Sequence, residues 1–240
     1  MLTEIENPDW ALAHFTLVAD LTTLRAECRF ARAGETVVAR YLGLPFAALA
    51  FWGNDPSQLA SLAAQLVAPA ESFYLLLNEQ QRALAAQIFE VEQVRPEWQM
   101  LFTGDAAALD PGAAQPLAVE NLEQMHTLAE NAGLMALETN PFRHGPAFGA
   151  WRGNRLVAMA ATHLLLPSAA EIGNIATHSD HRRQGLARQV IAALVRAHTA
   201  AGRRVFLMVF QSNRPAARLY EELGFRRLRP MFLLRCRRRE

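Results

Sequence analysis

The sequence predicts a mixed α/β protein, with a mixed sheet, organised in two lobes. Short apolar segments alternate with segments of helical period along both halves of the chain. A stretch rich in Ala, Asp, Gly and Pro at residues 103–116 is the best candidate for a linker. A chain of 240 residues can build two small hydrophobic cores. We therefore expect one domain over residues 1–106 and a second over residues 113–240.

Before the linker, the pattern predicts three helices and four strands. Helical periodicity covers residues 8–24, 56–67 and 79–89, and strand-like runs cover residues 36–41, 45–52, 72–77 and 97–102. The middle helix begins with Pro56, and Asp55 is placed to cap it. This order of elements is typical of a layered α/β lobe.

After the linker, the same alternation continues. We expect a strand over residues 117–119, a helix over 121–131 and a loop over 141–146. Strands over 147–151 and 156–166 form a hairpin, in which Gly153 and Asn154 supply the positive φ angles of a tight turn. Next come a strand over 170–177, a helix with apolar Val190, Ile191, Leu194 and Val195, a strand over 205–209, a helix from Arg214 and a last strand near 229–235.

Charge is divided unevenly along the chain, although the net charge is only +1. Residues 1–112 hold 6 Arg against 14 acidic residues, and residues 113–240 hold 18 Arg against 9. A basic second half would steer a polyanionic ligand toward it. We interpret the four arginines near the end, Arg235, Arg237, Arg238 and Arg239, as a solvated tail.

Composition excludes several classes of protein. No apolar run is long enough for a membrane span, and the acidic first six residues do not resemble a signal peptide. Two cysteines, Cys28 and Cys236, form neither a disulfide framework nor a zinc pattern, so we expect a reducing cytoplasm. Arginine without any lysine, together with abundant alanine, indicates a GC-rich bacterial genome. Basic residues are not interleaved with aromatic ones, which disfavours nucleic-acid binding.

The most informative segment is the basic turn Arg182-Arg183-Gln184-Gly185-Leu186-Ala187, because a strand precedes it and a long helix follows it. A strand–turn–helix of this kind presents backbone N–H groups and a positive helix end to a pyrophosphate, and Gly185 allows close approach. About thirty residues later come Asn213, Tyr220 and Gly224-Phe225. With these two motifs in this order, residues 115–235 resemble the GNAT superfamily of acyl-CoA-dependent N-acyltransferases.

The resemblance implies a fold, a cofactor and its binding residues. The N-terminal half looks like a degenerate GNAT-like domain, as in the two-lobed glycine N-acyltransferase-like branch. Acetyl-CoA would be the acyl donor, and no metal is expected. Its pyrophosphate would meet backbone N–H groups from Arg183 to Arg188, with Arg182 completing the motif. Its pantetheine arm would pair with the edge formed by Asn174, Ile175, Ala176 and Thr177, and would also meet Asn213, Ala217 and Tyr220.

Acyl transfer to an amine needs a base and a proton donor for the thiolate, but no covalent nucleophile. Tyr220 is the expected acid, the alternative being a core tyrosine beside Phe225. Glu171, eleven residues before Arg182, is the expected base, and strand alternation would put Glu171, Gly173 and Ile175 on one face. An ordinary edge-strand carboxylate is an equal alternative for Glu171, and water chains could replace it.

Other reactive side chains receive weaker interpretations. His163 is a reserve candidate for the base. His178 and His181 are more typical of local loop hydrogen bonding than of a metal pair. Cys28 lies in the half without the turn, which disfavours an acyl-cysteine route. An acceptor carboxylate could meet Arg143 and His144, in a pocket lined by Phe142, Phe148 and Trp151, although these aromatic residues suit a core equally well.

The sequence therefore predicts an N-acetyltransferase that moves an acetyl or short acyl group to a primary amine of a small molecule or amino acid. A non-catalytic acyl-CoA sensor and a protein N-terminal acetyltransferase are the alternatives. We expect a monomer or homodimer that binds neither nucleic acid nor membrane.

Overall fold

A computed structural model describes residues 4–134 and 137–239, which divide into two compact units. Unit 1 comprises residues 1–99 and 229–240, and unit 2 comprises residues 100–228. The chain passes from unit 1 to unit 2 within strand β5 (Phe89–Phe102) and returns within strand β11 (Phe225–Arg238). The loop at residues 103–116 thus lies inside unit 2, and the last strand, from residue 229 onward, groups with the N-terminal residues.

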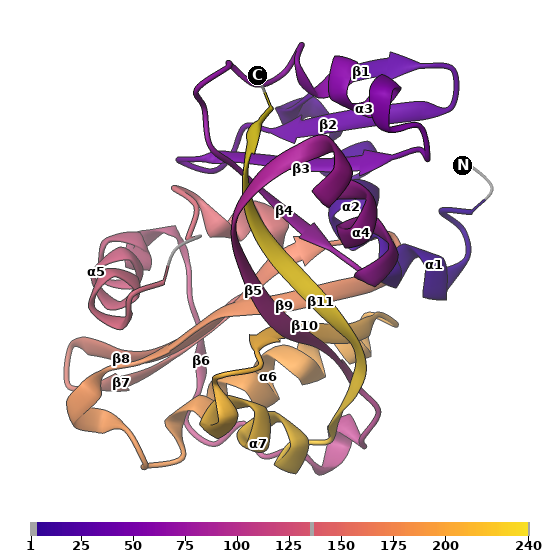
Figure 1. Cartoon of the computed structure of the whole chain (residues 1–240). Helices are drawn as coiled ribbons and strands as arrows, with labels where there is room; N and C mark the ends of the chain where they lie inside the picture. The colour runs from indigo at the N-terminus through magenta and orange to yellow at the C-terminus, as the bar shows by residue number, and fades with distance from the viewer. Residues whose placement is uncertain (1–3, 135–136, 240) are drawn as a thin grey trace. The chain divides into compact units, whose positions relative to one another are not determined.

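Unit 1 contains a sheet in the order β1-β2-β3-β4-β11-β5 (Figure 1). Strands β1 (Cys28–Ala33), β2 (Thr36–Tyr41) and β3 (Ala47–Trp52) are antiparallel neighbours, β4 (Phe73–Leu77) is parallel to β3, and β11 is antiparallel to β4. The helices are α1 (Pro8–Ala13), α2 (Phe15–Leu21), α3 (Pro56–Ala63) and α4 (Glu79–Ile88), and a 3₁₀ turn, η1 (Arg25–Glu27), precedes β1. Buried Phe73, Leu75 and Leu77 lie at the centre of its main core.

Unit 2 contains a sheet in the order β10-β9-β8-β7-β6. Strands β6 (Gln115–Pro116), β7 (Ala147–Arg152), β8 (Arg155–Leu165) and β9 (Ala169–Thr177) are antiparallel neighbours, and β10 (Arg204–Phe210) is parallel to β9. The helices are α5 (Leu122–Ala132), α6 (Leu186–Ala200) and α7 (Arg214–Glu222). Short 3₁₀ helices lie at η2 (Ala106–Ala108), η3 (Val119–Asn121), η4 (Pro141–His144) and η5 (Ser179–His181).

Helices α5 and α6 cover opposite faces of the unit 2 sheet. Ala161 of β8 packs in a core with Met125 and Leu128 of α5, whereas its neighbour Thr162 contacts His198 of α6. Successive strand residues point to opposite faces, so the two helices lie on different sides. Helix α6 packs its apolar stripe, Val190, Ile191, Leu194, Val195 and His198, as the sequence predicts.

The two units share one pattern of strand pairing. In both, two antiparallel pairs are followed by a parallel pair whose crossover contains a helix: β1-β2-β3-α3-β4 in unit 1 and β7-β8-β9-α6-β10 in unit 2. A further helix follows each parallel strand, α4 after β4 and α7 after β10. The expected mixed α/β fold with two related lobes is therefore confirmed.

Several expected elements have different boundaries. The helix expected over 8–24 is broken at His14 (φ −124°, ψ 32°), whose ring packs on Trp10 at 4.5 Å and on Trp52 at 5.2 Å between ring centroids. The strand expected over 117–119 is wrong: the side chain of Asn121 accepts a hydrogen bond from the Ala118 N–H (2.9 Å) and turns the chain into η3. Strand β1 was not expected, because its mixed polar sequence gives no clear alternation.

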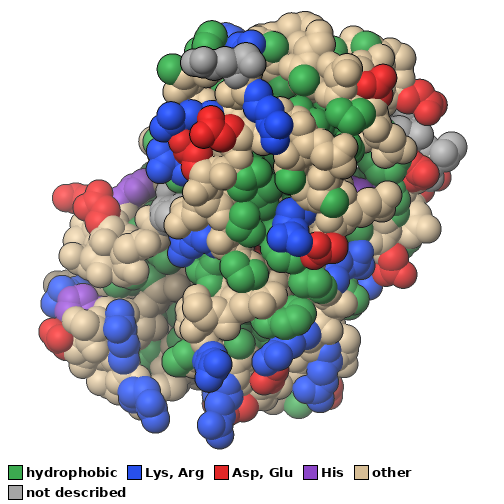
Figure 2. Space-filling view, in the orientation of Figure 1, with side chains coloured by type: hydrophobic (Ala, Val, Ile, Leu, Met, Phe, Trp, Pro, Cys, Tyr) green, Lys and Arg blue, Asp and Glu red, His purple; other side chains and the backbone are tan. Residues whose placement is uncertain are grey.

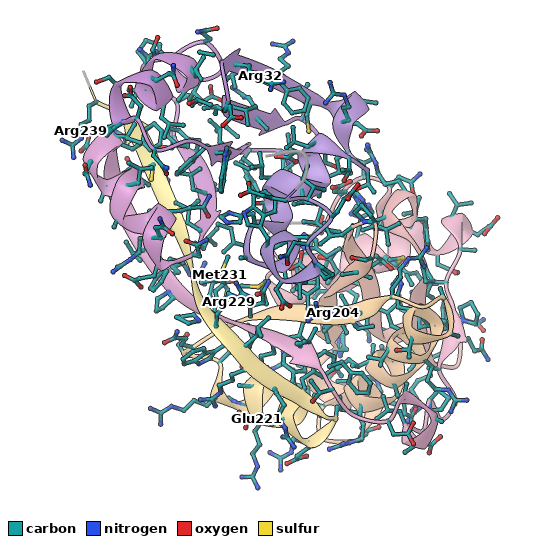
Figure 3. All side chains as sticks on the ribbon, turned by 90° about the vertical axis from the view of Figure 1, so that its right-hand side faces the viewer. Arg32, Arg204, Glu221, Arg229, Met231 and Arg239 are labelled. Carbon is teal, nitrogen blue, oxygen red and sulfur yellow. The ribbon has the colours of Figure 1, made fainter. Side chains whose placement is uncertain are left out.

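The two long strands β5 and β11 extend well beyond the segments that the sequence predicts. Their outer halves carry exposed charged residues, which conceal the period of two. In β11, buried Leu234 and Cys236 alternate with exposed Arg235 and Arg237, so the expected solvated tail is wrong. Both of these arginines form ion pairs with Glu92. Figure 3 shows this part of β11, from Arg229 and Met231 to Arg239.

The β7–β8 hairpin also differs in one detail. Gly153 has φ 55°, but Asn154 does not adopt a positive φ, so a single glycine makes the turn. No helix formed by the described residues is long and apolar enough to cross a membrane.

Candidate functional site

The predicted strand–turn–helix is present between β9 and α6. Gly185 is the N-cap residue of α6 with φ 76°, and its missing side chain leaves the helix without a side-chain cap. Arg183, two residues earlier, also has a positive φ of 65°. Alternating left-handed and right-handed residues form a concave nest of N–H groups, and the first turn of a helix adds further unsatisfied donors. This turn is built to receive an anion.

The equivalent turn of unit 1, between β3 and α3, is already occupied by a carboxylate. There the Asp55 side chain accepts a hydrogen bond from the Gln58 N–H (3.1 Å) at the helix start. The Gln81 side chain donates to the Phe51 carbonyl of β3 (3.1 Å). A negative cap repels a phosphate and occupies the same donors. Of the two related turns, the one in unit 2 suits an anionic ligand.

Arginines of the β7–β8 hairpin lie beside this turn, although the sequence suggested only a hairpin loop for them. The Arg152 guanidinium is 3.5 Å from Gln184 Oε1, and the Arg155 guanidinium is 2.7 Å from His178 Nε2. They add positive charge to that of exposed Arg182 and Arg183. The only sequence signal for this contribution was the pair of arginines on either side of Gly153 and Asn154. Their position beside the turn between β9 and α6 depends on how the hairpin packs.

Two arginines of the turn and of α6 already have partners. Arg188 forms a 2.6 Å ion pair with Glu222 of α7, which neutralises its charge, whereas Arg182 Nε donates to the uncharged Thr177 carbonyl (3.3 Å). Arginine side chains also protrude where α7 and the start of β11 lie (Figure 2). Unit 2 holds 13 Arg against 10 acidic residues, because the five arginines after Leu228 belong to unit 1. The charge excess expected around the site is therefore smaller than the linear halves suggest.

Strand β9 separates from β10 in front of the turn. Their parallel ladder pairs Arg204 with Ala169, Val205 with Ala170 and Phe206 with Glu171, and among the described residues it ends there. Strand β9 nevertheless continues to Thr177, still paired with β8 on its other side. The edge formed by residues 172–177 therefore offers backbone groups to an extended ligand.

A β-bulge interrupts β9 at Asn174, which has φ 50°. Gly173 pairs with Ala161 and Ala176 pairs with Met159, so two residues of β9 oppose Ala160. Since Ala161 and Met159 share a face, Gly173 and Ala176 do too. Ile175 consequently does not share the face of Glu171 and Gly173, and the expectation of continuous alternation is wrong there.

Glu171 is a buried carboxylate rather than an exposed edge residue. Its side chain is 4% exposed, and its Oε2 lies 3.0 Å from Nδ1 of His163 on β8. The His163 side chain is 30% exposed. The expected base and its reserve candidate therefore form one hydrogen-bonded pair.

Tyr220 of α7 is also buried, and its ring packs against Phe225 at 6.1 Å between centroids in an edge-on arrangement. Burial raises the pKa of the Tyr220 phenol to about 12, so it is protonated at neutral pH. The structure thus combines the two interpretations of Tyr220: it packs as a core residue, and it carries a proton that it could donate. Ala217, one turn earlier, is buried on the same helix.

Asn213 is the N-cap of α7, with its side chain accepting from the Ala216 N–H at 3.3 Å. Its structural interpretation is therefore confirmed, and contact with a ligand stays a prediction. His178 likewise bonds locally, because it caps η5 through the Asp180 N–H (3.3 Å). Among the residues that the structure describes, no cluster of three His, Cys, Asp or Glu could hold a metal ion.

The loop expected to form the acceptor pocket is η4 and its flanks. Buried His144 Nε2 approaches Glu138 Oε2 to 2.9 Å, although without hydrogen-bond angles, and Arg143 lies 3.9 Å from the same carboxylate. Phe142 and Trp151 are partly buried and pack against the core of unit 2, and their contact with an acceptor stays a prediction. Phe148, on β7 opposite Pro116 and Ala160, is half-buried.

Cys28 lies in unit 1, where buried Asp20 accepts a hydrogen bond from its thiol. Burial and the neighbouring carboxyl both raise the pKa of this thiol, which keeps it protonated and unreactive. An acyl-cysteine route has no support from this environment.

Comparisons with known proteins agree with this architecture. Residues 147–233 match the family model described as FR47-like protein. A GNAT-family protein of Novosphingobium aromaticivorans DSM 12444 has a TM-score of 0.77 and 25% identity, over 95% of this chain and 99% of that one. A search of the curated proteins gives no match.

Two more distant structures share the fold along almost the whole chain. A GCN5-related N-acetyltransferase from Kribbella flavida has a TM-score of 0.65 and 18% identity, over 95% of this chain and 96% of that one. A tandem GNAT protein from the clavulanic acid biosynthesis pathway has a TM-score of 0.61 and 14% identity, over 96% of both chains. The chain therefore has the tandem GNAT fold, with an FR47-like domain in its C-terminal half.

Proposed function

We propose that this protein is an acyl-CoA-dependent N-acetyltransferase. It transfers an acetyl or short acyl group from acetyl-CoA to a primary amine of a small molecule or amino acid, by direct attack within a ternary complex. The observation that carries this proposal is the uncapped N-terminus of α6 behind the positive φ angles of Arg183 and Gly185. It suits a diphosphate, and it adjoins a free strand edge that suits the amide-bearing arm of the same molecule.

The binding roles follow from these positions. Backbone N–H groups from Arg183 to Arg188 hold the diphosphate, and Arg152 and Arg155 add positive charge beside it. The edge of residues 174–177 pairs with the pantetheine amides, and Ala217 and Asn213 on α7 flank the arm. An N–H of the bulge near Ile175 polarises the thioester carbonyl. Tyr220 donates a proton to the departing thiolate, for which its high pKa keeps the proton available.

The acceptor proposal is narrower than the sequence suggests. Arg143 is exposed and lies 3.9 Å from the Glu138 carboxylate, so a carboxylate on the acceptor would compete with Glu138 for it. His144 is buried and serves that loop structurally, which leaves Arg143 and the half-buried Phe142 and Phe148 as the acceptor residues of the proposal. A relation to the glycine N-acyltransferase-like branch and a cytoplasmic location remain predictions.

The non-catalytic acyl-CoA sensor is the main alternative, since it needs the same turn and strand edge. A sensor has no use for a buried, hydrogen-bonded Glu171 and His163 at the end of the β9–β10 ladder, and this pair favours the enzyme. A protein N-terminal acetyltransferase is the second alternative, and it needs the same chemistry with a peptide acceptor.

The test is release of free thiol from acetyl-CoA with a panel of amino acids, aliphatic and aromatic amines, and short peptides. Thiol release with a small amine supports the proposal, and release with peptides alone supports the N-terminal acetyltransferase. Calorimetry with acetyl-CoA is run in parallel. Binding without thiol release from any acceptor leaves the sensor, and absence of binding refutes all three functions.

A further inference from the structure

The pair formed by His163 and Glu171 has the geometry of an oriented imidazole. Nδ1 of His163 lies 3.0 Å from Oε2 of Glu171. An ionised carboxylate can only accept a hydrogen bond, so the imidazole donates through Nδ1–H. Neutral His163 then carries its lone pair on Nε2, the nitrogen that points away from the carboxylate.

Gly173 gives the imidazole its place on the sheet. A Cβ at Gly173 would come within 2.9 Å of the His163 Cβ and 3.3 Å of its Cγ. The missing side chain therefore lets His163 lie directly over β9. His163 is also the extra residue of a second irregularity, between the pairs of Thr162 with Ile172 and Leu164 with Glu171. A bulge that re-aims one side chain in this way is typical of functional positions.

The pair lies where β9 and β10 separate. Glu171 forms the last rung of their ladder, opposite Phe206, and the bulge at Asn174 follows three residues later. Burial distinguishes the two members: the Glu171 side chain is 4% exposed and the His163 side chain is 30% exposed. An ammonium group can thus reach the imidazole from solvent, whereas the carboxylate is covered.

We propose that His163 is the general base of the transfer and that Glu171 is a positioning residue that acts through it. This inference rests on the proposed function. Nε2 of His163 removes one proton from the ammonium of the acceptor. The amine nitrogen then forms a bond to the thioester carbonyl carbon, and the carbon–sulfur bond breaks.

The proton balance of this step is complete. The ammonium loses two protons on becoming an amide. His163 passes the first to water and then takes the second from the nitrogen of the tetrahedral intermediate. Tyr220 protonates the departing thiolate and recovers a proton from His163 through water, so one proton in all is released to solvent. Glu171 fixes the tautomer of His163 and stabilises the imidazolium that forms. The role resembles that of a carboxylate behind any catalytic histidine, with an amine in place of a hydroxyl nucleophile.

The kinetic test compares His163→Asn, Glu171→Gln and the wild type with acetyl-CoA and the best amine of the panel. We expect His163→Asn to lower kcat about 100-fold while KM for acetyl-CoA changes less than about threefold. Glu171→Gln should lose less, about tenfold, because the imidazole remains. Added imidazole should restore activity to His163→Ala, which a structural role could not explain. A larger loss for Glu171→Gln than for His163→Asn, or no rescue, overturns the proposal.

His126→Asn is the matched control, because His126 is a half-buried histidine of α5 whose Nε2 lies 3.4 Å from the Thr139 carbonyl. It should retain wild-type kcat. Melting temperatures of all variants check folding. If His163→Asn unfolds, Gly173→Ala displaces the imidazole without removing it and should lower kcat in the same sense.

A spectroscopic arm separates this inference from the proposed function. Long-range ¹H–¹⁵N spectra of the full chain should show the His163 ring protonated at Nδ1, and Glu171→Gln should abolish that preference. Acetyl-CoA should shift the His163 resonances. If the wild type releases no thiol with any amine, the proposed function fails. These spectra still show whether Glu171 fixes the tautomer of His163. A ring protonated at Nε2 refutes the proposed role of His163. So do His163 resonances that stay unchanged when acetyl-CoA binds and shifts the backbone amide signals of β9.

Discussion

Replacement of Gly185 tests the anion-binding turn most directly, because the same helix supplies an internal control. Gly185 begins α6 with φ 76°, and Gly202 follows its end with φ 72°. A Cβ built at either glycine meets nothing within 4 Å, so neither alanine variant clashes with the protein. Both variants should lose the same backbone freedom, but only Gly185 lies at the proposed diphosphate site.

The expected magnitudes follow from this geometry. A left-handed conformation costs an L-residue about 1–2 kcal/mol, so Gly185→Ala and Gly202→Ala should each lower the free energy of unfolding by about that amount. Gly185→Glu adds a negative charge next to two phosphates. Unit charges at about 4 Å repel by about 1 kcal/mol in bulk water and about 4 kcal/mol at a protein surface. We expect a loss of about 2–4 kcal/mol in coenzyme A binding, or about 30- to 1,000-fold in Kd.

The assay is isothermal titration of coenzyme A into the wild type and the three variants, with urea unfolding of each. Raising the salt concentration should reduce the difference between Gly185→Glu and the wild type, because salt screens charges at an exposed turn. Gly202→Ala should bind as the wild type does. If Gly185→Glu binds coenzyme A with wild-type affinity, or if both alanine variants lose affinity equally, the turn does not hold the diphosphate.

Three further predictions concern buried groups. Tyr220→Phe should lower kcat about 10- to 100-fold and leave the Kd of coenzyme A unchanged; unchanged kcat would remove Tyr220 from the mechanism. Burial raises the pKa of Asp20 from 3.8 to about 7, so the wild type should lose up to about 4 kcal/mol of unfolding free energy as the pH rises from 4 to 7. In urea titrations, the free energy of unfolding of Asp20→Asn minus that of the wild type should therefore be larger above pH 7 than at pH 4. A difference that does not change with pH contradicts this. Burial lowers the pKa of His198 from 6.5 to about 4, so its neutral form stabilises the fold above pH 6.5 and up to about 3 kcal/mol is lost as the pH falls to 4. In His198→Gln that acid-dependent loss should disappear from urea titrations, and an unchanged pH slope refutes the assignment.

The tautomer of His198 follows from its neighbours and explains why acid is unfavourable there. Thr162 Oγ1 lies 2.8 Å from the Pro146 carbonyl, which can only accept, so the threonine hydroxyl donates to it. His198 Nε2, 2.8 Å from the same Oγ1, must then be the donor to threonine. Nδ1 is left buried, and no partner for it exists among the described residues. A second proton on this ring would be buried without an acceptor.

Local sequence patterns were sufficient for the elements that depend on neighbours in the chain. The apolar stripe of α6, the glycine at its start and the hairpin glycine Gly153 each act within one or two turns of backbone. Asp55 and Asn213 cap their helices as the sequence predicts, since a cap needs only the next three residues. The mixed α/β class followed from the alternation of these elements.

Features that depend on pairing with another strand could not be predicted from local sequence patterns. Strand β11 carries arginines at alternate positions and becomes a strand because Phe232 to Cys236 pair with Leu77 to Phe73 of β4. The bulge at Asn174 reverses the faces of Ile175 and Ala176, and it depends on the register with β8. Strand β4 is far from β11 in the sequence. Strand β8 directly precedes β9, but the register between them contains two irregularities that the period of neither strand reveals.

By itself, the sequence determined the turn that could hold a diphosphate and the identity of Glu171 and Tyr220, because glycine placement and residue type are local properties. The tertiary structure alone decided that His163 lies over Gly173 and forms a hydrogen bond with Glu171. It also decided that Arg152 and Arg155 lie beside the turn between β9 and α6, and that Arg143 already has a carboxylate neighbour. Strand register and hairpin packing bring those residues together, and register is set by burial across the whole sheet rather than by any one segment.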